Sequence, residues 1–178
     1  AKYHGEKMIP FVSYDHWFGM GNDITIDNLK IQALRAAEIG IEIFVVDAGW
    51  FIGDFPSGVG NYSVDPVKFP NGLEELASYI ECLGMGMGLW FEPERICEGT
   101  EIATEHPDWL MKHFGIDDLQ GSYLLNLARI DVQDYLIELI GGFIERLHLK
   151  WSRWDFNIRP LPFWREFDIN STCCQGCE

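Results

Sequence analysis

The stretch Trp151-Ser152-Arg153-Trp154-Asp155-Phe156-Asn157 decides how the rest of the chain is interpreted. A short apolar segment, residues 147–149, precedes it, and an irregular segment with two prolines, residues 158–162, follows it. This pattern predicts a β-strand that ends at a carboxylate, where enzymes built on a barrel of parallel strands keep their reactive groups. An aspartate held by a neighbouring arginine and an asparagine amide can stay ionised and act as a nucleophile. The alternative is that Asp155 only caps the turn after the strand.

The same layout occurs three times earlier in the chain. Apolar segments at residues 11–15, 41–46 and 86–91 each predict a strand, and the first of these is expected to be buried. The first leads into a loop with glycines and aromatic residues. The second and third end in Asp47-Ala48-Gly49-Trp50 and Glu92-Pro93-Glu94-Arg95. Acidic residues therefore collect at successive strand ends, together with indole side chains.

Helices are predicted between the strands, because apolar residues recur there with the spacing of one helix face. The segments are residues 27–39, 71–83 and 131–147. Asp27 is the expected N-cap of the first helix, and Asn71 with Glu74 resembles a capping box at the start of the second. Gly40 and Gly84 are expected to end these two helices.

Alternation of strand and helix predicts an α/β protein with a parallel sheet and right-handed crossovers. Polar groups at the ends of successive strands favour a (β/α)8 TIM barrel, of which about the first four βα units are present, because a full barrel needs roughly 250 residues. An open doubly wound sheet is the alternative, but no G-x-G-x-x-G motif opens a helix. The alternating glycines of residues 84–88 indicate close packing within a strand. We therefore assign residues 1–165 to a partial barrel.

Residues 166–178 form an atypical, cysteine-rich tail, which we interpret as the result of truncation or of a shifted reading frame. Cys82 and Cys97 are expected to be reduced core thiols. The remaining cysteines are Cys173, Cys174 and Cys177. They lack a second Cys/His pair to complete a zinc site. No two histidines share a strand end, so we expect neither a metal nor another cofactor, and a metal-dependent barrel enzyme ranks last. His16 is the one histidine that is a candidate to line the site.

The formal net charge of −15 argues against nucleic acids and anionic membranes as partners and suits a neutral ligand. No signal-peptide pattern opens the sequence and no apolar run is long enough to span a membrane, so we expect a cytoplasmic protein.

Five ordered motifs resemble glycoside hydrolase family 36, the α-galactosidases. They are residues 44–50, 65–73, 88–94, 106–110 and 153–157. The resemblance covers roughly residues 9–165 and implies the N-terminal half of a (β/α)8 catalytic barrel with a retaining mechanism. It also implies an oligosaccharide or another α-galactoside as substrate, and it allows a homo-oligomeric full-length protein.

The resemblance implies a role for each matching residue. Asp155 would be the nucleophile that forms the glycosyl-enzyme, and Asp47 would accept hydrogen bonds from sugar hydroxyls. Trp90 and Trp17 would form walls of the sugar subsite. The groups that would hold the sugar and orient Asp155 are Arg153 and Asn157. Glu92 would be a subsite group or a support behind the subsite.

The sequence also departs from the family pattern. Ala48 replaces the second aspartate that many members have, and Arg153 replaces a lysine, whose ammonium binds differently from a planar guanidinium. Gln120 or a neighbour stands where an arginine is common. These differences indicate a divergent branch, for which an α-N-acetylgalactosaminide or another α-glycoside is an alternative substrate.

The general acid belongs, by the same resemblance, to a later barrel strand, beyond the end of this sequence. A retaining glycosidase needs this second carboxyl about 5 Å from the nucleophile. We therefore expect the 178 residues alone to be inactive, and a non-catalytic sugar-binding remnant is the alternative to an enzyme.

Overall fold

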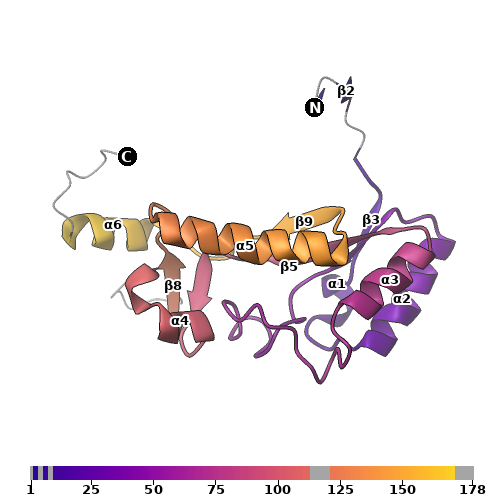
Figure 1. Cartoon of the computed structure of the whole chain (residues 1–178), viewed down its shortest axis with the longest axis horizontal. Helices are drawn as coiled ribbons and strands as arrows, with labels where there is room; N and C mark the ends of the chain where they lie inside the picture. Colours follow the sequence, from indigo (N-terminus) through magenta and orange to yellow (C-terminus); the bar gives the residue numbers. More distant parts are fainter. Residues whose placement is uncertain (1, 4–5, 8–9, 113–120, 171–178) are drawn as a thin grey trace.

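The computed structural model describes residues 2–3, 6–7, 10–112 and 121–170. Its centre is a four-stranded sheet in which every neighbouring pair is parallel (Figure 1). The strands, in their order across the sheet, are β3 (Ser13–Asp15), β4 (Ile43–Val46), β5 (Gly86–Phe91) and β9 (Trp151–Trp154). The order across the sheet follows the order along the chain, as in successive units of a barrel. The predicted α/β class and parallel sheet are confirmed.

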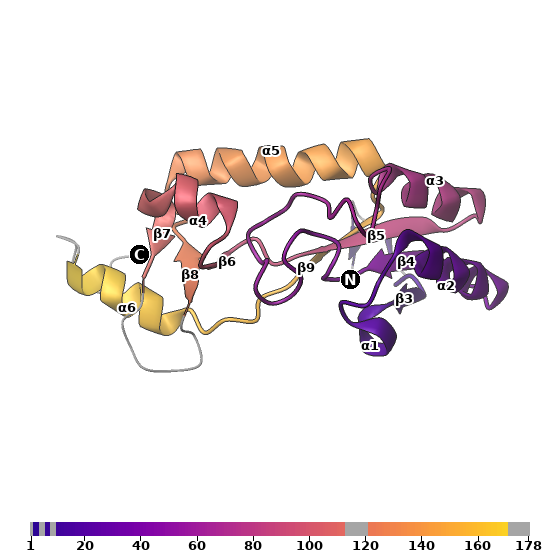
Figure 2. The same cartoon turned by 90° about the horizontal axis from the view of Figure 1, so that it is seen from below.

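Three helices lie between successive strands of this sheet. They are α2 (Ile26–Glu38), α3 (Glu74–Cys82) and α5 (Ile130–Leu147). Figure 2 shows α5 lying along one side of the sheet, with α3 beside one end of it. Positive φ angles at Gly40 and Gly84, just after α2 and α3, agree with the predicted ends of these helices.

Smaller elements surround this core. They are β1 (Lys2–Tyr3), β2 (Glu6–Lys7), α1 (Trp17–Met20), β6 (Arg95–Cys97), α4 (Glu101–Glu105), the 3₁₀ helix η1 (Pro107–Trp109), β7 (Leu110–Met111), β8 (Ser122–Leu125) and α6 (Leu161–Asn170). β1 and β2 form an antiparallel pair, and β6, β8 and β7 form a second sheet, also antiparallel. α6 crosses the expected domain boundary at residues 165–166. No described helix is both long and apolar enough to cross a bilayer.

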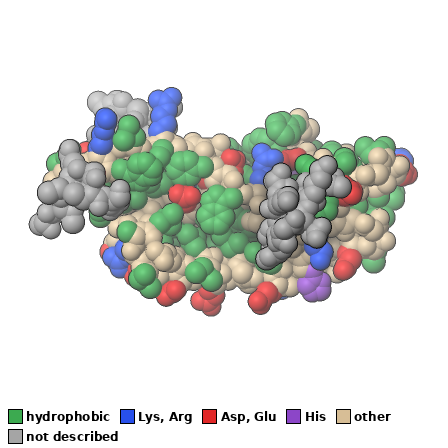
Figure 3. Space-filling model, turned by 90° about the horizontal axis from the view of Figure 1, so that it is seen from above, with side chains coloured by type: hydrophobic (Ala, Val, Ile, Leu, Met, Phe, Trp, Pro, Cys, Tyr) green, Lys and Arg blue, Asp and Glu red, His purple; other side chains and the backbone are tan. Residues whose placement is uncertain are grey.

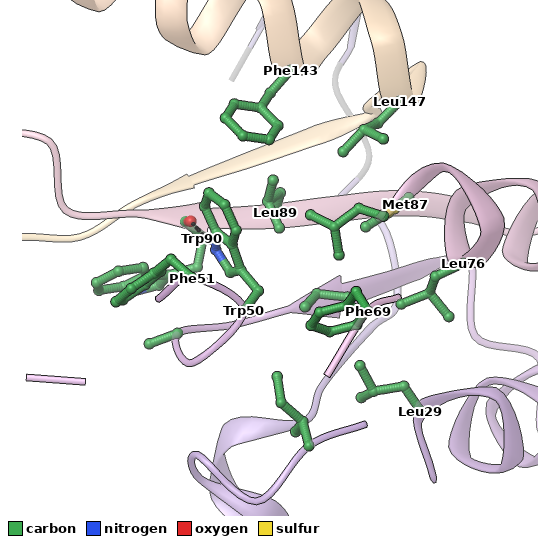
Figure 4. Packing of buried hydrophobic residues seen from close by; sticks show 14 of the residues in the cluster. Leu29, Trp50, Phe51, Phe69, Leu76, Met87, Leu89, Trp90, Phe143 and Leu147 are labelled. Carbon is green, nitrogen blue, oxygen red and sulfur yellow. Dashed lines mark hydrogen bonds between the residues drawn. The ribbon is translucent and has the colours of Figure 1, made fainter. Parts of the chain in front are cut away.

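The two faces of the parallel sheet have different roles, because successive side chains of a strand point to opposite faces. Met87, Leu89 and Phe91 of β5 belong to the main core cluster, together with Phe143 and Leu147 of α5. Figure 4 shows Phe143 and Leu147 projecting from their helix toward the strands. This face is therefore the one that the helices cover, and the opposite face is available to build a site.

The alternating glycines of β5 are needed for close packing, as predicted. A Cβ atom on Gly86 would lie 2.6 Å from Cγ of Lys150 and 2.8 Å from Cδ1 of Ile43. One on Gly88 would lie 3.1 Å from Cγ2 of Val45 and 3.2 Å from Cβ of Trp151.

Both predicted helix caps are wrong. Thr25, and not Asp27, caps α2: its hydroxyl accepts the N–H of Asn28, whose side chain in turn accepts the N–H of Thr25. At α3 the N-cap is Leu73, without a side-chain cap. The amide of Asn71 instead donates to Glu75. In each case several polar residues near the helix start could serve as caps, and the path of the preceding loop selects among them.

Three further expectations are corrected. Phe11 and Val12 are more than half exposed and precede β3, which lies at an edge of the sheet and is not buried. Cys82 is exposed, although Cys97 is a buried free thiol. Trp17 begins the short helix α1 where a loop was expected.

Candidate active site

Four strand ends bring the polar residues together on the face that the helices leave free. Trp90 of β5 is directly opposite Arg153 of β9, and Asp15 of β3 is opposite Val45 of β4. Asp47 and Asp155 follow two residues after Val45 and Arg153, so they continue on the same face.

These residues line a cavity of about 290 Å³, close to the lower end of the roughly 300–1,000 Å³ typical of small-molecule sites. The lining residues are Trp17, Phe18, Asp47, Ala48, Phe55, Trp90, Arg153, Asp155 and Asn157. Six of the seven predicted site residues are therefore neighbours. Glu92, the seventh, lies outside the cavity wall.

The Asp155 carboxylate is held by donors from three residues. Nε1 of Trp90 donates to Oδ2 at 3.0 Å, and Nδ2 of Asn157 donates to the same oxygen at 2.8 Å. The N–H of Phe156 donates to Oδ1 at 2.9 Å. Partial burial raises the pKa of Asp155, but these hydrogen bonds, with the charge of Arg153, outweigh burial and leave the pKa below its ordinary value. Asp155 is thus an ionised carboxylate with a fixed orientation.

Trp90 is almost completely buried, and its indole N–H donates to Asp155, which lines the same cavity. Its ring stacks on Phe51, with centroids 6.0 Å apart. Its carbonyl oxygen accepts Nε1 of Trp50 at 3.0 Å, a bond drawn in Figure 4. The predicted wall residue is therefore also a hydrogen-bond donor to Asp155.

Asp47 is buried, with its two carboxylate oxygens in different surroundings. Oδ1 accepts the N–H of Ala48 at 2.8 Å. Oδ2 lies 3.0 Å from Nε of Arg153, yet it accepts no well-aligned hydrogen bond from any described residue. Burial raises the pKa of Asp47 to about 7; the nearby Asp15 carboxylate adds to the rise, whereas the Ala48 N–H and Arg153 oppose it. Asp47 therefore titrates near neutral pH.

Arg153 contacts different carboxylates from the one expected. We predicted that it would orient Asp155, but its Nη1 forms an ion pair with Asp15 and its Nε pairs with Asp47. Its charge only assists the ionisation of Asp155. The sequence contained a signal for Asp15, since it is another acid at a strand end, yet it was not selected as a site residue.

His16 is buried behind the site and supports Asp47. Its Nδ1 accepts the backbone N–H of Asp47 at 2.9 Å, so the ring proton resides on Nε2, which donates to the carbonyl of Gly21 at 3.2 Å. Burial lowers the pKa of His16 and favours this neutral form. The expected contribution of His16 to the cavity lining is not observed.

Glu92 is fully buried and contacts the site through Asn157. Its carboxylate accepts the backbone N–H of Asn157 and, at 3.3 Å, Nδ2 of the same residue. Burial raises the pKa of Glu92. Nη1 of Arg95 lies 3.8 Å from Oε2 of Glu92. Among the alternatives stated for Glu92, this geometry favours a support behind the subsite.

Three aromatic side chains outside the sheet, Trp17, Phe18 and Phe55, form part of the cavity lining. Phe55 and Trp17 meet edge to face, with ring centroids 5.3 Å apart. Phe18, which also lines the cavity, is 83% exposed. Phe55 was missed because it comes from the long loop after β4, whose path the sequence pattern does not reveal.

A larger hollow of about 480 Å³ lies at the opposite ends of β4 and β5, lined in part by Glu42, Met85 and Lys150. It contains none of the strand-end groups described above. Within the described ranges, no group of three or more His, Cys, Asp or Glu is placed to hold a metal ion. Gln120 and the three C-terminal cysteines lie outside those ranges.

Comparison with known proteins identifies the family. Residues 2–161 match the Melibiase family. The chain is 35% identical over 150 residues to alpha-galactosidase Mel36A of Lactobacillus acidophilus, an alignment that covers 82% of this chain and 20% of that protein. It is 34% identical over 147 residues to alpha-galactosidase AgaA of Geobacillus stearothermophilus, covering 80% and 20%.

Solved structures agree with this result. The alpha-galactosidase from Lactobacillus brevis superimposes with a TM-score of 0.76 at 33% identity, covering 82% of this chain and 20% of that one. A variant of the GH36 alpha-galactosidase AgaA in complex with raffinose gives a TM-score of 0.73 at 32% identity, covering 82% and 21%. The chain thus spans about a fifth of the length of these relatives, and its parallel sheet corresponds to part of their (β/α)8 barrel. The chain belongs to the Melibiase family, within glycoside hydrolase family 36.

Proposed function

We propose that this chain supplies the galactose-binding wall and the nucleophile of a retaining α-galactosidase. One observation carries the proposal: an oriented, ionised Asp155 shares a small cavity with the Asp47–Arg153 pair. Supporting it, relatives at 34–35% identity are named alpha-galactosidases, and one related structure is a complex with raffinose.

Sugar recognition would use atoms of Asp47 and Arg153 whose hydrogen-bonding capacity the described residues do not fill. Oδ2 of Asp47 can accept a hydroxyl hydrogen, and the guanidinium of Arg153 can donate to a neighbouring hydroxyl oxygen. The rings of Trp17 and Phe55 provide an apolar surface for the C–H face of the sugar.

In the reaction, an oxygen of Asp155 would attack the anomeric carbon. The bond from that carbon to the glycosidic oxygen breaks, and the leaving oxygen takes the electron pair together with a proton from a second carboxyl. Water then cleaves the galactosyl–Asp155 ester and regenerates the carboxylate. The hydrogen bonds from Trp90 and Asn157 would hold the Asp155 carboxylate in place and keep it ionised.

The second carboxyl is not evident among the described residues. Asp47 pairs with Arg153, Glu92 holds Asn157, and Glu94 accepts the indole N–H of Trp154 at 3.2 Å. We therefore propose that the 178-residue chain binds the sugar without hydrolysing it.

The test is titration calorimetry of the 178-residue chain with galactose, glucose and N-acetylgalactosamine. Galactose is expected to bind more tightly than glucose, which differs only in the orientation of one hydroxyl. N-acetylgalactosamine is included because Ala48 departs from the family pattern. Asp47→Asn is expected to weaken galactose binding about tenfold or more, since a hydrogen bond to a charged group contributes about 1.5–3 kcal/mol. Asp27→Asn, an exposed change on α2, is the matched control.

Equal binding of galactose and glucose, or an unchanged affinity in Asp47→Asn, would contradict the assignment of a galactose site. If N-acetylgalactosamine binds more tightly than galactose, N-acetylgalactosamine replaces galactose as the proposed ligand. Turnover of an aryl α-galactoside by the 178-residue chain would overturn the claim that this chain does not hydrolyse its ligand.

A further inference from the structure

The carboxylate of Asp15 connects the two outermost strands of the parallel sheet. It stands at the end of β3, and its Oδ2 pairs with Nη1 of Arg153 on β9, 138 residues later. Its Oδ1 accepts the N–H of Trp17 at 2.9 Å. The side chain is 13% exposed. The Asp15 carboxylate therefore holds both the backbone of Trp17 and the cation of the site, Arg153.

The guanidinium of Arg153 is fixed by two of its nitrogens. Nη1 is paired with Asp15, and Nε lies 3.0 Å from Oδ2 of Asp47. Because a guanidinium is planar, these two contacts set the direction of the third nitrogen. Nη2 has no acceptor among the described residues, and Arg153 lines the cavity. A lysine ammonium, common at this position in the family, lacks this planar fork and would not set a donor direction in the same way.

The charge on Asp47 depends on the same group. Its neighbours are the Asp15 carboxylate and the neutral His16 at the end of β3, Arg153 of β9, and Asp155 in the same cavity. Asp15 opposes ionisation of Asp47 in two ways: it carries a like charge nearby, and it shares the only cation that pairs with Asp47 among the described residues.

We propose that Asp15 is a positioning residue for ligand recognition. It aims the Arg153 guanidinium at the cavity, and it sets whether Asp47 meets a ligand hydroxyl as a charged carboxylate or as a neutral carboxylic acid. The ligand part of this inference rests on the proposed sugar site. The part that concerns the charge of Asp47 is independent of the sugar site, because it is tested on the chain without ligand.

The test compares the 178-residue chain with Asp15→Asn. Asparagine keeps an oxygen that can accept the Trp17 N–H but removes the charge. Carbon-13 NMR of the side-chain carboxyls is used to follow the titration of Asp47 without ligand. Its midpoint is expected to fall by about one pH unit, because removing one nearby like charge shifts a carboxyl by about that amount or more. Asp23→Asn, an exposed carboxylate on the segment before α2, should leave the midpoint unchanged.

Galactose affinity gives a second readout. In the unmodified chain, affinity is expected to decline as the pH falls through about 7, because protonation removes the charged acceptor. In Asp15→Asn this decline moves to lower pH. Loss of affinity by the same factor at every pH would instead mark Asp15 as merely structural and overturn the proposal.

The two proposals can fail separately. If galactose binds at no pH, the galactose site is refuted, and the Asp47 titration still decides the role of Asp15 in setting its charge. An Asp47 midpoint equal in the two proteins refutes that role. If Asp15→Asn does not fold, Arg153→Gln replaces it: loss of the shared cation must raise the Asp47 midpoint, and an unchanged midpoint overturns the inference.

Discussion

At the scale of single residues, the site depends on carboxylates that accept hydrogen bonds from the same few donor residues. Asn157 is the clearest case, because its side-chain amide lies between the half-buried Asp155 carboxylate, at 2.8 Å, and the buried Glu92 carboxylate, at 3.3 Å. Glu92 also accepts the backbone N–H of Asn157. A buried carboxylate thereby fixes the residue that orients the proposed nucleophile.

Asn157→Ala is expected to raise the pKa of Asp155, because it removes a donor that favours the ionised form. The carboxyl carbon of Asp155, followed by NMR from pH 2 to 7, is the measurement. Asn71→Ala, which removes an amide that donates to Glu75, is the control. The idea fails if Asp155 titrates at the same pH in all three proteins.

The same variant changes the response of stability to acid. A carboxyl whose pKa is lowered in the folded state stabilises the fold above its unfolded pKa, and this contribution disappears as the pH falls through the folded value. Asn157→Ala should therefore lose less stability than the unmodified chain between pH 6 and pH 3.

At the scale of elements, the loop of residues 51–64 closes one side of the cavity. Its ends are joined by a bridge between Phe51 and Val64. Asn22 exchanges two hydrogen bonds with the backbone of Phe55, of 2.7 and 3.0 Å. These contacts bring Phe55 to the site, so the loop must keep its compact path.

Gly58→Ala is expected to destabilise the chain by about 1–3 kcal/mol, the usual cost of inserting a methylene into packed structure. The new Cβ would lie 2.7 Å from the carbonyl carbon of Gly53 and 2.8 Å from the carbonyl oxygen of Asp54, and backbone atoms cannot easily move away. Urea unfolding provides the measurement.

Gly142→Ala is the matched substitution, and it is expected to stabilise the chain where Gly58→Ala destabilises it. Gly142 lies in α5 with nothing within 4 Å of its would-be Cβ. Alanine should therefore stabilise the helix by about 0.5–1 kcal/mol. Equal effects of the two substitutions would show that the loop is less tightly packed than described.

At the scale of the whole molecule, the parallel sheet has a strand without an outer neighbour at each side, β3 and β9, within the described ranges. Parallel sheets are normally covered on both faces and closed at the edges in barrels. Trp151 and Trp154 of β9 are 44% and 51% exposed. Figure 3 shows hydrophobic side chains gathered along one long face of the molecule.

We expect the 178-residue chain to self-associate through the β9 edge, more strongly at high salt, because salt screens the repulsion between molecules of net charge −15. Trp154→Lys should reduce association, since a lysine on an edge strand opposes strand pairing. Ile39→Lys adds the same charge at a residue that is 76% exposed just after α2, and it is the control. Light scattering at several protein concentrations is the measurement. A monomer under all conditions would rule out this edge as a contact.

Much of the fold and of the site followed from local pattern. Strand and helix segments could be predicted because hydrophobic periodicity is a property of adjacent residues. Six of seven expected site residues share one cavity because strand ends of a parallel sheet meet at one edge. Helix caps were less predictable: Thr25 and Asp27 are both good cap residues, and only the chain path before α2 distinguishes them.

The sequence by itself determined the parallel α/β architecture, the family and the strand-end position of Asp155, since each is encoded in segments of a few residues. Only the tertiary structure decided the partners of the charged groups. Arg153 pairs with Asp15 and Asp47, which are more than 100 residues away along the chain, and Glu92 is buried behind Asn157. Ion pairing and burial depend on distances across strands, and those distances exist only once the sheet has formed.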